Sequence, residues 1–531
     1  MSDRFTLREL SRYPLGTFAD IIYRNALLYA DDDAFVYGPK KLNFSQFNAQ
    51  VNSLIHALQK MGIKKGDVLG ILSWNCIETA EVHGAAMKGG FIASPFNPRA
   101  REDELAYIIN DSEATILFVG NEMEEITEQL RSRIPTVKHV VSFENSNSSM
   151  DSYCDILSEG SQEEPDIQVE EEDPFVIYYT SGTSGKPRGA LYIHQQRILD
   201  TCLRALQVGM EPRDRHLMIL PLFHIGGSSH FWTFYFMGGC NIFLSERRFD
   251  PVATLEAIRS EAITDVHIVP TQLVAILSLP DLENYQVPSL KRILYAASPM
   301  PVEILKKGIE IFGPIFMQLY GQSESGPDIT FLSAKDHLVI NQSPEEQKIL
   351  SSSGRPCLWA HVRIVDKNDK DVKQGDVGEI VVQSKKVMKE YWRKPEETRE
   401  VMAGGWLHTG DLGYCDEKGY IYIVDRKKDM IITGGENVYP REVEEILYRH
   451  PSIQEVAVIG IPHPYWVESV HALVVIKGGH HPGEQEIIEF CKHHLAGYKA
   501  PKSVEFVDSL PKNPQGKILK KEIRAKYRSN R

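Results

Sequence analysis

The sequence predicts an α/β fold with a large N-terminal part and a smaller C-terminal part. Apolar runs of strand length alternate with helical patterns through the first half of the chain. After about residue 354 the pattern changes to β-type runs, and a second alternation of helix and strand follows from about residue 427. With 531 residues the chain is too long for one hydrophobic core, so at least two domains are expected.

The N-terminal elements predict parallel strands covered by helices. Residues 44–61 have the spacing of an amphipathic helix, and 68–73 and 114–119 are apolar runs typical of buried strands. The acidic segment 158–173 is expected to be a surface linker. Further strand-like runs lie at 175–179, 266–269, 292–296 and 314–319.

The C-terminal elements predict an antiparallel β subdomain and then a small α/β unit. The β subdomain contains runs at 362–365, 379–383 and 420–424, with glycines between them. The small unit follows a charged segment that begins at Asp425. Its elements are expected at 441–449 (helix), 456–461 and 472–476 (strands), and from 483 (helix). We therefore place the domains at 1–426 and 427–531.

Composition excludes several classes of protein. A formal charge of −13 argues against nucleic-acid binding. Seven scattered cysteines without a Cys-x-x-Cys pair fit a reducing, cytoplasmic location and no zinc site. Residues 216–245 contain no Asp, Glu, Lys or Arg, but Pro221 and the polar residues 226–230 interrupt them. We therefore expect a buried segment lining an apolar pocket and no transmembrane segment.

The most informative stretch is residues 175–189, an apolar run that ends in glycines and hydroxyls around Lys186. It predicts a phosphate-holding loop after a buried strand, because glycines allow close approach and Lys186 adds positive charge. It is not a Walker A loop. That motif requires a glycine in place of Thr180 and a Ser or Thr in place of Pro187.

The order Tyr-Thr-Ser-Gly-Thr-Ser-Gly-Lys-Pro at 179–187 resembles the signature of the adenylate-forming superfamily. This superfamily includes acyl-CoA synthetases, luciferases and peptide-synthetase adenylation domains. Further segments match in order over nearly the whole chain: 221–224, 295–299, 318–324, 406–411, 425–429, 430–440 and 511–517. The resemblance implies an acyl-CoA synthetase-like fold, with two α/β layered subdomains and a β subdomain followed by a small, mobile α+β domain.

The resemblance also implies nucleotide-binding roles. Tyr320 would stack on adenine, Ser323 would contact the α-phosphate, and Asp411 would bind the ribose hydroxyls with Arg426 nearby. The residues expected to bind ATP and AMP are Thr180, Ser181, Gly182, Thr183, Ser184, Gly185, Lys186, Ala297, Ser298, Pro299, Tyr320, Gly321, Gln322, Ser323, Asp411, Ile423, Arg426 and Lys517. Glu324 and Thr180 are expected to hold Mg2+.

By the same resemblance, Lys517, His224 and Glu324 are the expected catalytic residues, and Lys428 is the expected hinge between the domains. The acyl pocket is expected at His224, Ile225, Gly226, Gly227, Ala296 and Gly321, and the coenzyme A path at Gly434, Gly435 and Glu436. Glycines in that path would let a thin pantetheine arm pass.

These residues imply an AMP-forming acyl-CoA synthetase whose substrates are a small-molecule carboxylate, ATP and coenzyme A. Relatives specific for acetate carry a tryptophan where this chain has Gly321, so a medium-chain, long-chain, cyclic or aromatic acid is expected. Two alternatives stay open: an adenylation enzyme that loads another acceptor, and a non-catalytic AMP or acyl sensor. The sequence is also compatible with a homo-oligomer.

Overall fold

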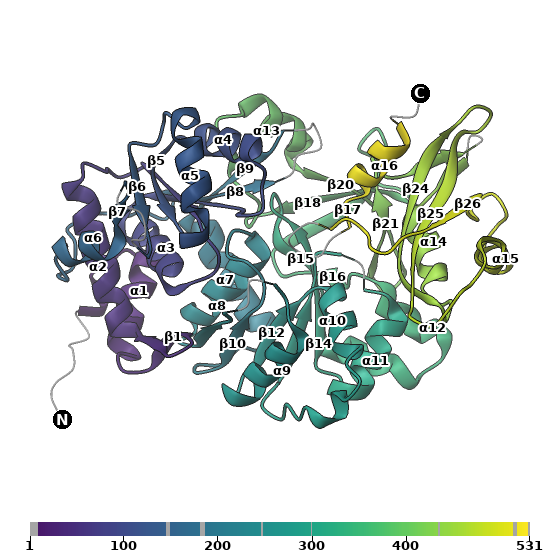
Figure 1. The fold of residues 1–531 in the computed structure, drawn as a ribbon, viewed down its shortest axis with the longest axis horizontal. Coiled ribbons are helices and arrows are strands. Elements are labelled where there is room, and N and C mark those ends of the chain that lie inside the picture. Colours follow the sequence, from purple (N-terminus) through teal and green to yellow (C-terminus); the bar gives the residue numbers. More distant parts are fainter. Residues whose placement is uncertain are drawn as a thin grey trace.

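The computed structural model describes residues 9–144, 149–180, 186–245, 248–298, 300–433, 436–512 and 518–528. These residues form a large N-terminal domain and a small C-terminal domain, as the sequence predicts (Figure 1). In Figure 1 the small domain, yellow-green to yellow, lies beside the antiparallel sheet of the large domain.

The first sheet of the large domain is mostly parallel and carries the start of the predicted phosphate loop. Its strand order is β19(Glu390–Tyr391), β9(Arg188–Ile193), β8(Pro174–Thr180), β4(Ile92–Phe96), β3(Val68–Leu72), β5(Ala114–Val119), β6(His139–Ser142) and β7(Asp151–Ser152). Helices α1(Phe18–Leu28), α2(Phe44–Lys60), α3(Ile77–Gly89), α4(Glu102–Asp111), α5(Glu124–Leu130) and α6(Tyr153–Glu159) surround it. All residues of β3 and β4 are buried, which explains their continuous apolar character.

The second sheet has its strands in the order β16(Arg355–Pro356), β15(Gly326–Leu332), β14(Phe316–Gln322), β13(Arg292–Tyr295), β12(Asp265–Ile268), β10(Arg215–Met218), β11(Cys240–Phe243), β1(Asp33–Tyr37) and β2(Lys40–Asn43). Strands β10 to β14 are parallel. Helices α9(Pro251–Ser260), α10(Pro270–Leu277) and α11(Val302–Phe312) pack on one face. Helices α7(His194–Val208) and α8(Ile225–Phe236) pack on the other, between the two sheets.

The uncharged segment 216–245 is buried core, as predicted, and consists of β10, α8 and β11. Among the helices that the structure describes, none combines the length and the apolar character that crossing a membrane requires.

The remaining strands form two smaller sheets. The predicted antiparallel β subdomain has the order β17(Ala360–Val365), β18(Gly378–Ser384), β20(Leu407–Cys415) and β21(Ile421–Arg426). The small domain pairs β22(Ile431–Thr433), β23(Glu436–Val438), β24(Ile453–His463), β25(Val467–Ile476) and β26(Ser503–Phe506), with α14(Pro440–Leu447), α15(Glu484–His494) and α16(Lys520–Arg528). The last residue of β21, Arg426, is thus the end of the large domain's sheet.

The acidic segment 158–173 differs from the expected surface linker, because part of it is fixed to the core. Glu164 forms an ion pair with the fully buried Lys88, at 2.6 Å between Oε2 and Nζ. It also accepts hydrogen bonds from Tyr13, Asn48 and Asn52. Burial lowers the pKa of Lys88 to about 8, although Glu164 opposes the shift. One of the acidic residues of this segment, Glu164, is therefore the specific partner of a buried charge, the Lys88 ammonium.

A buried cluster of five charged side chains ties three parts of the large domain together. Arg197, Asp200 and Arg204 belong to α7, Asp328 to β15, and Lys386 to the segment after β18. Arg204 bonds Asp328, Arg197 lies 3.0 Å from Asp200, and the Lys386 ammonium lies within 4 Å of both carboxylates. Each of these side chains is at most 4% exposed.

Replacing Asp328 by Asn should lower the free energy of unfolding by about 3 kcal/mol or more, because Arg204 and Lys386 would lose a buried counter-charge. Urea unfolding followed by fluorescence measures the change. The control is Glu396→Ala, which removes a largely exposed ion pair with Arg399 and should change stability by less than about 1 kcal/mol. Equal effects of the two substitutions would contradict the role of the cluster.

Candidate active site

Thr180 and Glu324 meet where strand β8 ends. Thr180 is the last residue of β8, and Glu324 lies in the hairpin between β14 and β15. The Thr180 hydroxyl lies 3.4 Å from Glu324 Oε1, and the Tyr391 hydroxyl donates to the same oxygen at 2.8 Å. The Arg188 guanidinium lies over the Tyr391 ring, 4.3 Å from its centre. Two hydroxyl groups, those of Thr180 and Tyr391, therefore hold the same oxygen of the Glu324 carboxylate.

The oxygens of Thr180 and Glu324 are hard donors of the kind that Mg2+ prefers. Within the described residues, no group of three or more His, Cys, Asp or Glu side chains could hold a metal ion. This arrangement fits a cation that takes one carboxylate from the protein and its other ligands from phosphates and water, as Mg2+ usually does with nucleotides.

Asp411 organises a second group of predicted residues. It accepts hydrogen bonds from the Tyr320 hydroxyl at 2.8 Å and from Gln322 Nε2 at 2.6 Å, and it pairs with Arg426 at 3.0 Å. Asp411 raises the pKa of Arg426, so the guanidinium stays charged. Burial, together with Asp411, holds the pKa of Tyr320 well above its ordinary value, so its ring is a neutral, apolar surface.

The segment after β13 brings Ala296, Ala297 and Ser298 beside this group. β13 pairs in parallel with β14, with Tyr295 opposite Gln318. Ala297 has a φ of 72°, a left-handed conformation that costs free energy for any residue with a Cβ. An exposed alanine held there indicates that the chain turns sharply around this edge of the sheet.

The residues predicted for the acyl pocket lie at the N-terminus of α8. His224 is the N-cap residue, and burial lowers its pKa to about 4, so its ring is neutral at physiological pH. A Cβ on Gly227 would lie 2.4 Å from the Pro221 carbonyl oxygen, so glycine is required there for packing. Gly226 is partly exposed, and His267 Cε1, at 3.9 Å, is the one described atom within 4 Å of where its Cβ would be.

Glycine at position 321 is explained by close packing of the backbone, whereas the sequence suggested that it makes room in the acyl pocket. A Cβ at this position would lie 2.3 Å from the carbonyl oxygen of Gly326 and 2.5 Å from the carbonyl carbon of Pro327. The strand pairing between β14 and β15 shifts register here, and the backbones approach closely. The size of the acyl pocket therefore does not follow from the absence of a side chain at Gly321.

Lys186 is the first described residue after the predicted phosphate loop, and its ammonium lies over an aromatic ring. Its ammonium is 5.3 Å from the centre of Tyr107. The Tyr107 hydroxyl donates to Asp111, which also accepts hydrogen bonds from Tyr179 and Lys394. A cation over an aromatic face is attracted by the ring, so the Tyr107 ring favours this position of the Lys186 ammonium.

Several predicted residues lie outside the described residues: Ser181, Gly182, Thr183, Ser184, Gly185, Pro299, Gly434, Gly435 and Lys517. Glu436, exposed, begins β23. Lys428 follows β21, and burial together with Arg426 lowers its pKa. Ile423 lies on β21, where its carbonyl oxygen accepts a hydrogen bond from Arg441.

The structure thus joins Thr180 to Glu324, and Tyr320 and Gln322 to Asp411 and Arg426. Ser323 connects the two groups along the hairpin, and its carbonyl oxygen accepts a hydrogen bond from Tyr192 at 2.6 Å. Sequence reasoning missed Tyr391 and Tyr192. Arg188, two positions after Lys186, is the one signal in the sequence that could have pointed to Tyr391. Its contact with the Tyr391 ring, however, depends on the pairing of β19 with β9, which the sequence does not predict.

Comparisons with known proteins give one family. A family model described as AMP-binding enzyme matches residues 22–392, and the model of the AMP-binding enzyme C-terminal domain matches 442–517. The chain is 34% identical over 504 residues to the medium/long-chain-fatty-acid–CoA ligase FadD8 of Mycobacterium tuberculosis, covering 92% of this chain and 86% of the relative. It is 33% identical over 508 residues to a feruloyl-CoA synthase of Amycolatopsis sp, covering 95% and 98%.

Among solved structures, the chain is similar to the anthranilate CoA ligase AuaEII in complex with anthranoyl-AMP. The TM-score is 0.89, with 27% sequence identity and 98% of each chain covered. The fatty acyl CoA synthetase of Mycobacterium tuberculosis gives a TM-score of 0.76 with 30% identity, covering 97% of this chain and 99% of the other.

Replacing Asp411 by Asn should weaken AMP binding about tenfold or more, because a charged acceptor of hydrogen bonds would become a neutral one. Isothermal titration calorimetry with AMP measures the affinity. Asp371→Asn is the control, because Asp371 makes an exposed ion pair with Arg363 in the same subdomain. Unchanged AMP affinity in Asp411→Asn would contradict the assignment.

Proposed function

The chain belongs to the AMP-binding enzyme family, and from this premise we propose that it is an AMP-forming acyl-CoA synthetase, an acid–thiol ligase. One observation carries the proposal. The Thr180–Glu324 pair and the Asp411 group are linked by the hairpin from Tyr320 to Glu324. This arrangement supports a nucleotide with its phosphates at the first pair and its ribose and base at the second group.

In the first half-reaction, a carboxylate oxygen attacks the α-phosphorus of ATP and pyrophosphate leaves, which gives an acyl adenylate. Anions approach one another in this step, so the protein must offset negative charge in the transition state. Lys186 and Lys517 are the cations proposed for this task. The neutral His224 ring is proposed to position the carboxylate by a hydrogen bond, without adding charge.

Glu324 and Thr180 are the residues that would hold Mg2+, which would screen the phosphate charge when bound. Tyr391 supports this role by fixing one oxygen of Glu324 through its hydroxyl. Because burial and the Glu324 charge raise the pKa of Tyr391, this hydroxyl keeps its proton and stays a donor.

In the second half-reaction, the thiol sulfur of coenzyme A attacks the adenylate carbonyl carbon, and AMP leaves. Gly434, Gly435 and Glu436 are proposed to line the path of the pantetheine arm. Lys517 and these residues belong to the same small domain, so we propose that the domain rotates about Lys428 between the half-reactions. The proposed boundary between residues 426 and 427 coincides with the end of β21.

The substrate class is a carboxylic acid larger than acetate, in keeping with the fatty-acid and aryl ligases among the relatives. Loading of another acceptor and non-catalytic sensing are the alternatives to be tested. The cytoplasmic location stays a prediction, supported by seven free cysteines.

Pyrophosphate release should depend on both ATP and a carboxylate, and AMP and a thioester should appear when coenzyme A is added. A panel from acetate through octanoate and palmitate to benzoate measures this. Lys517→Ala should slow adenylate formation by on the order of a hundredfold. Pyrophosphate release without a thioester would indicate another acceptor. AMP binding without turnover of any acid would indicate a sensor.

Lys428→Pro should slow thioester formation more than adenylate formation, because proline fixes φ and restricts the rotation. In the described residues, the hydrogen bonds of this turn come from the N–H groups of Lys427, Asp429 and Met430, so the proline removes none of them. The two half-reactions are measured separately, as pyrophosphate release and as transfer from preformed adenylate. Lys428→Ala is the control. Equal losses in both half-reactions would argue against a hinge.

A further inference from the structure

One stripe of helix α8 runs from the substrate end of the site into the core. Gly226, His230 and Phe234 are four residues apart and therefore share a face of the helix. This face packs against β10 and β12 of the second sheet: the His230 ring lies 4.6 Å from His216 and 5.3 Å from His267, between ring centres. The same face of the helix thus carries the partly exposed Gly226 and, one turn further along, the His230 ring between His216 and His267.

His267 closes the space in front of Gly226. It lies on β12, one residue before the carboxyl end of the strand, which is the edge where ligands bind in parallel sheets. Its Cε1 lies 3.9 Å from the Cβ position of Gly226. Its neighbour on β13 is Leu294, two residues before Ala296, which is one of the residues predicted for the acyl pocket.

His230 and His267 are both buried, and in the part of the chain that the structure describes neither ring makes a hydrogen bond. His230 is 0% exposed and His267 is 3% exposed. Among the described residues, no atom is placed to bond either ring nitrogen of His230 or of His267. His216, the third ring, differs because it bonds Asn241 at 2.9 Å. Buried polar groups are nearly always satisfied, so four such nitrogens side by side indicate a missing hydrogen-bonding partner.

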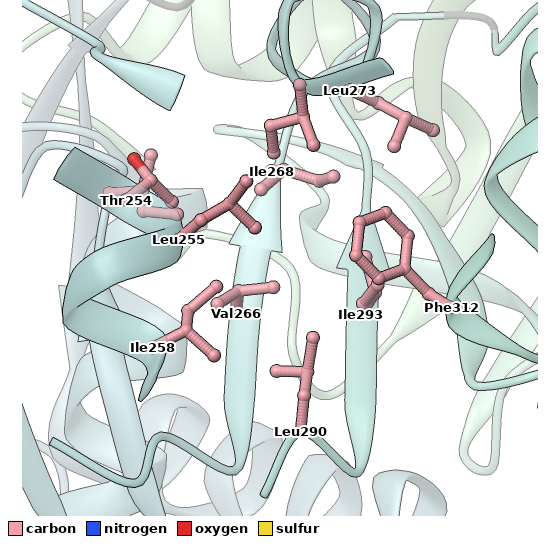
Figure 2. A pocket seen from close by; sticks show the side chains of 11 residues that line it. Thr254, Leu255, Ile258, Val266, Ile268, Leu273, Leu290, Ile293 and Phe312 are labelled. Carbon is pink, nitrogen blue, oxygen red and sulfur yellow. The ribbon is translucent and has the colours of Figure 1, made fainter. Parts of the chain in front are cut away.

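The opposite face of β12 does not offer a comparable site. Val266 and Ile268 alternate with His267 and point to the other side of the sheet, where they line the cavity shown in Figure 2. That cavity has a volume of about 10 Å³, at the lower limit for one water molecule, and its lining is apolar apart from Thr254. The polar partner is therefore to be sought on the α8 side.

The charge around the histidines favours a neutral partner. Burial, with Arg204 adding to the effect, lowers the pKa of His267 to about 3, and burial likewise lowers that of His230. A neutral imidazole has one donor and one acceptor nitrogen. Two neutral rings can therefore donate to and accept from one hydroxyl group, or donate to a carbonyl oxygen.

We propose that the acyl site ends on His267 and His230, and that the enzyme selects carboxylic acids carrying an uncharged hydroxyl or carbonyl oxygen at the end remote from the carboxylate. The inference rests on the proposed function and specifies its substrate class. His267 and His230 are then specificity-determining residues that bind the remote oxygen, whereas His224 positions the reacting carboxylate.

Helix geometry gives the size of the acid. From His224 to His230 the helix rises roughly 9 Å, and from Gly226 to His230 roughly 6 Å, at about 1.5 Å per residue. A polar oxygen about 6–9 Å from the carboxyl carbon would reach the two rings. 4-Hydroxycinnamate and 6-hydroxyhexanoate have this reach, and cinnamate and hexanoate are their partners without the hydroxyl.

The test compares each hydroxylated acid with its unsubstituted partner, using the full-length enzyme and ATP-dependent pyrophosphate release. The ratio of the two kcat/KM values cancels any difference in the active fraction of a preparation. We expect a preference of about tenfold or more for the hydroxylated acid, because an acid without the hydroxyl group leaves the buried histidine nitrogens unpaired. Hexanedioate tests whether a charged end group is accepted instead.

Variants then separate recognition from stability. His267→Leu should reduce the ratio to about one or reverse it, and His267→Gln, which retains hydrogen-bonding groups, should keep part of the preference. His83→Leu is the matched control. His83 is also a buried histidine without a hydrogen bond in the described residues, but it lies on α3 near Trp232, on another side of α8. It should leave the ratio unchanged.

A wild-type ratio of one or less, a preference for hexanedioate, or the same ratio in His267→Leu as in the wild type would overturn the inference while leaving the ligase intact. The absence of pyrophosphate release with every acid would overturn the proposed function, and the inference with it.

Discussion

The charge balance inside the large domain is the constraint on which the active site depends. Asp200 and Asp328 lie in the core with Arg197, Arg204 and Lys386 around them. Although burial acts to raise it, Arg204 and Lys386 hold the pKa of Asp328 below its ordinary value. Burial and the adjacent Asp328 raise the pKa of Asp200. Desolvated charges of this kind tolerate few alternative arrangements, because each displaced partner would be left alone.

The cluster matters for chemistry because of what its members are attached to. Asp328 is on β15, directly after the hairpin that carries Glu324, and Lys386 precedes β19, which carries Tyr391. Helix α7 follows β9, the strand that comes after the predicted phosphate loop. The segments that meet at Glu324 are thus fixed a short distance away by ion pairs. A carboxylate is held more precisely when the segments that support it are rigid.

Much of this could be predicted from the sequence, and the exceptions have physical reasons. Apolar runs located strands such as β5 and β12 because both are buried on two faces. The motifs along the sequence predicted that Thr180, Glu324 and Asp411 belong to one site, and the structure places Thr180 beside Glu324 and Asp411 beside Tyr320. Tyr391 and His267 carry no local signal, because their roles arise from strand pairing and from a helix face. Gly321 was interpreted by its missing side chain, whereas the close approach of β15 requires it.

The segment that contains Glu164 illustrates how composition can mislead about exposure. A run of acidic residues between two subdomains resembles a tether, and tethers are where chains are cut by proteases and where insertions are tolerated. Here Val169 is fully buried and Glu164 is the counter-ion of Lys88. The segment is accordingly a poor place for proteolytic cleavage, for a fusion partner or for a circular permutation. Opening it would leave the Lys88 ammonium without its carboxylate partner among the helices that surround the first sheet.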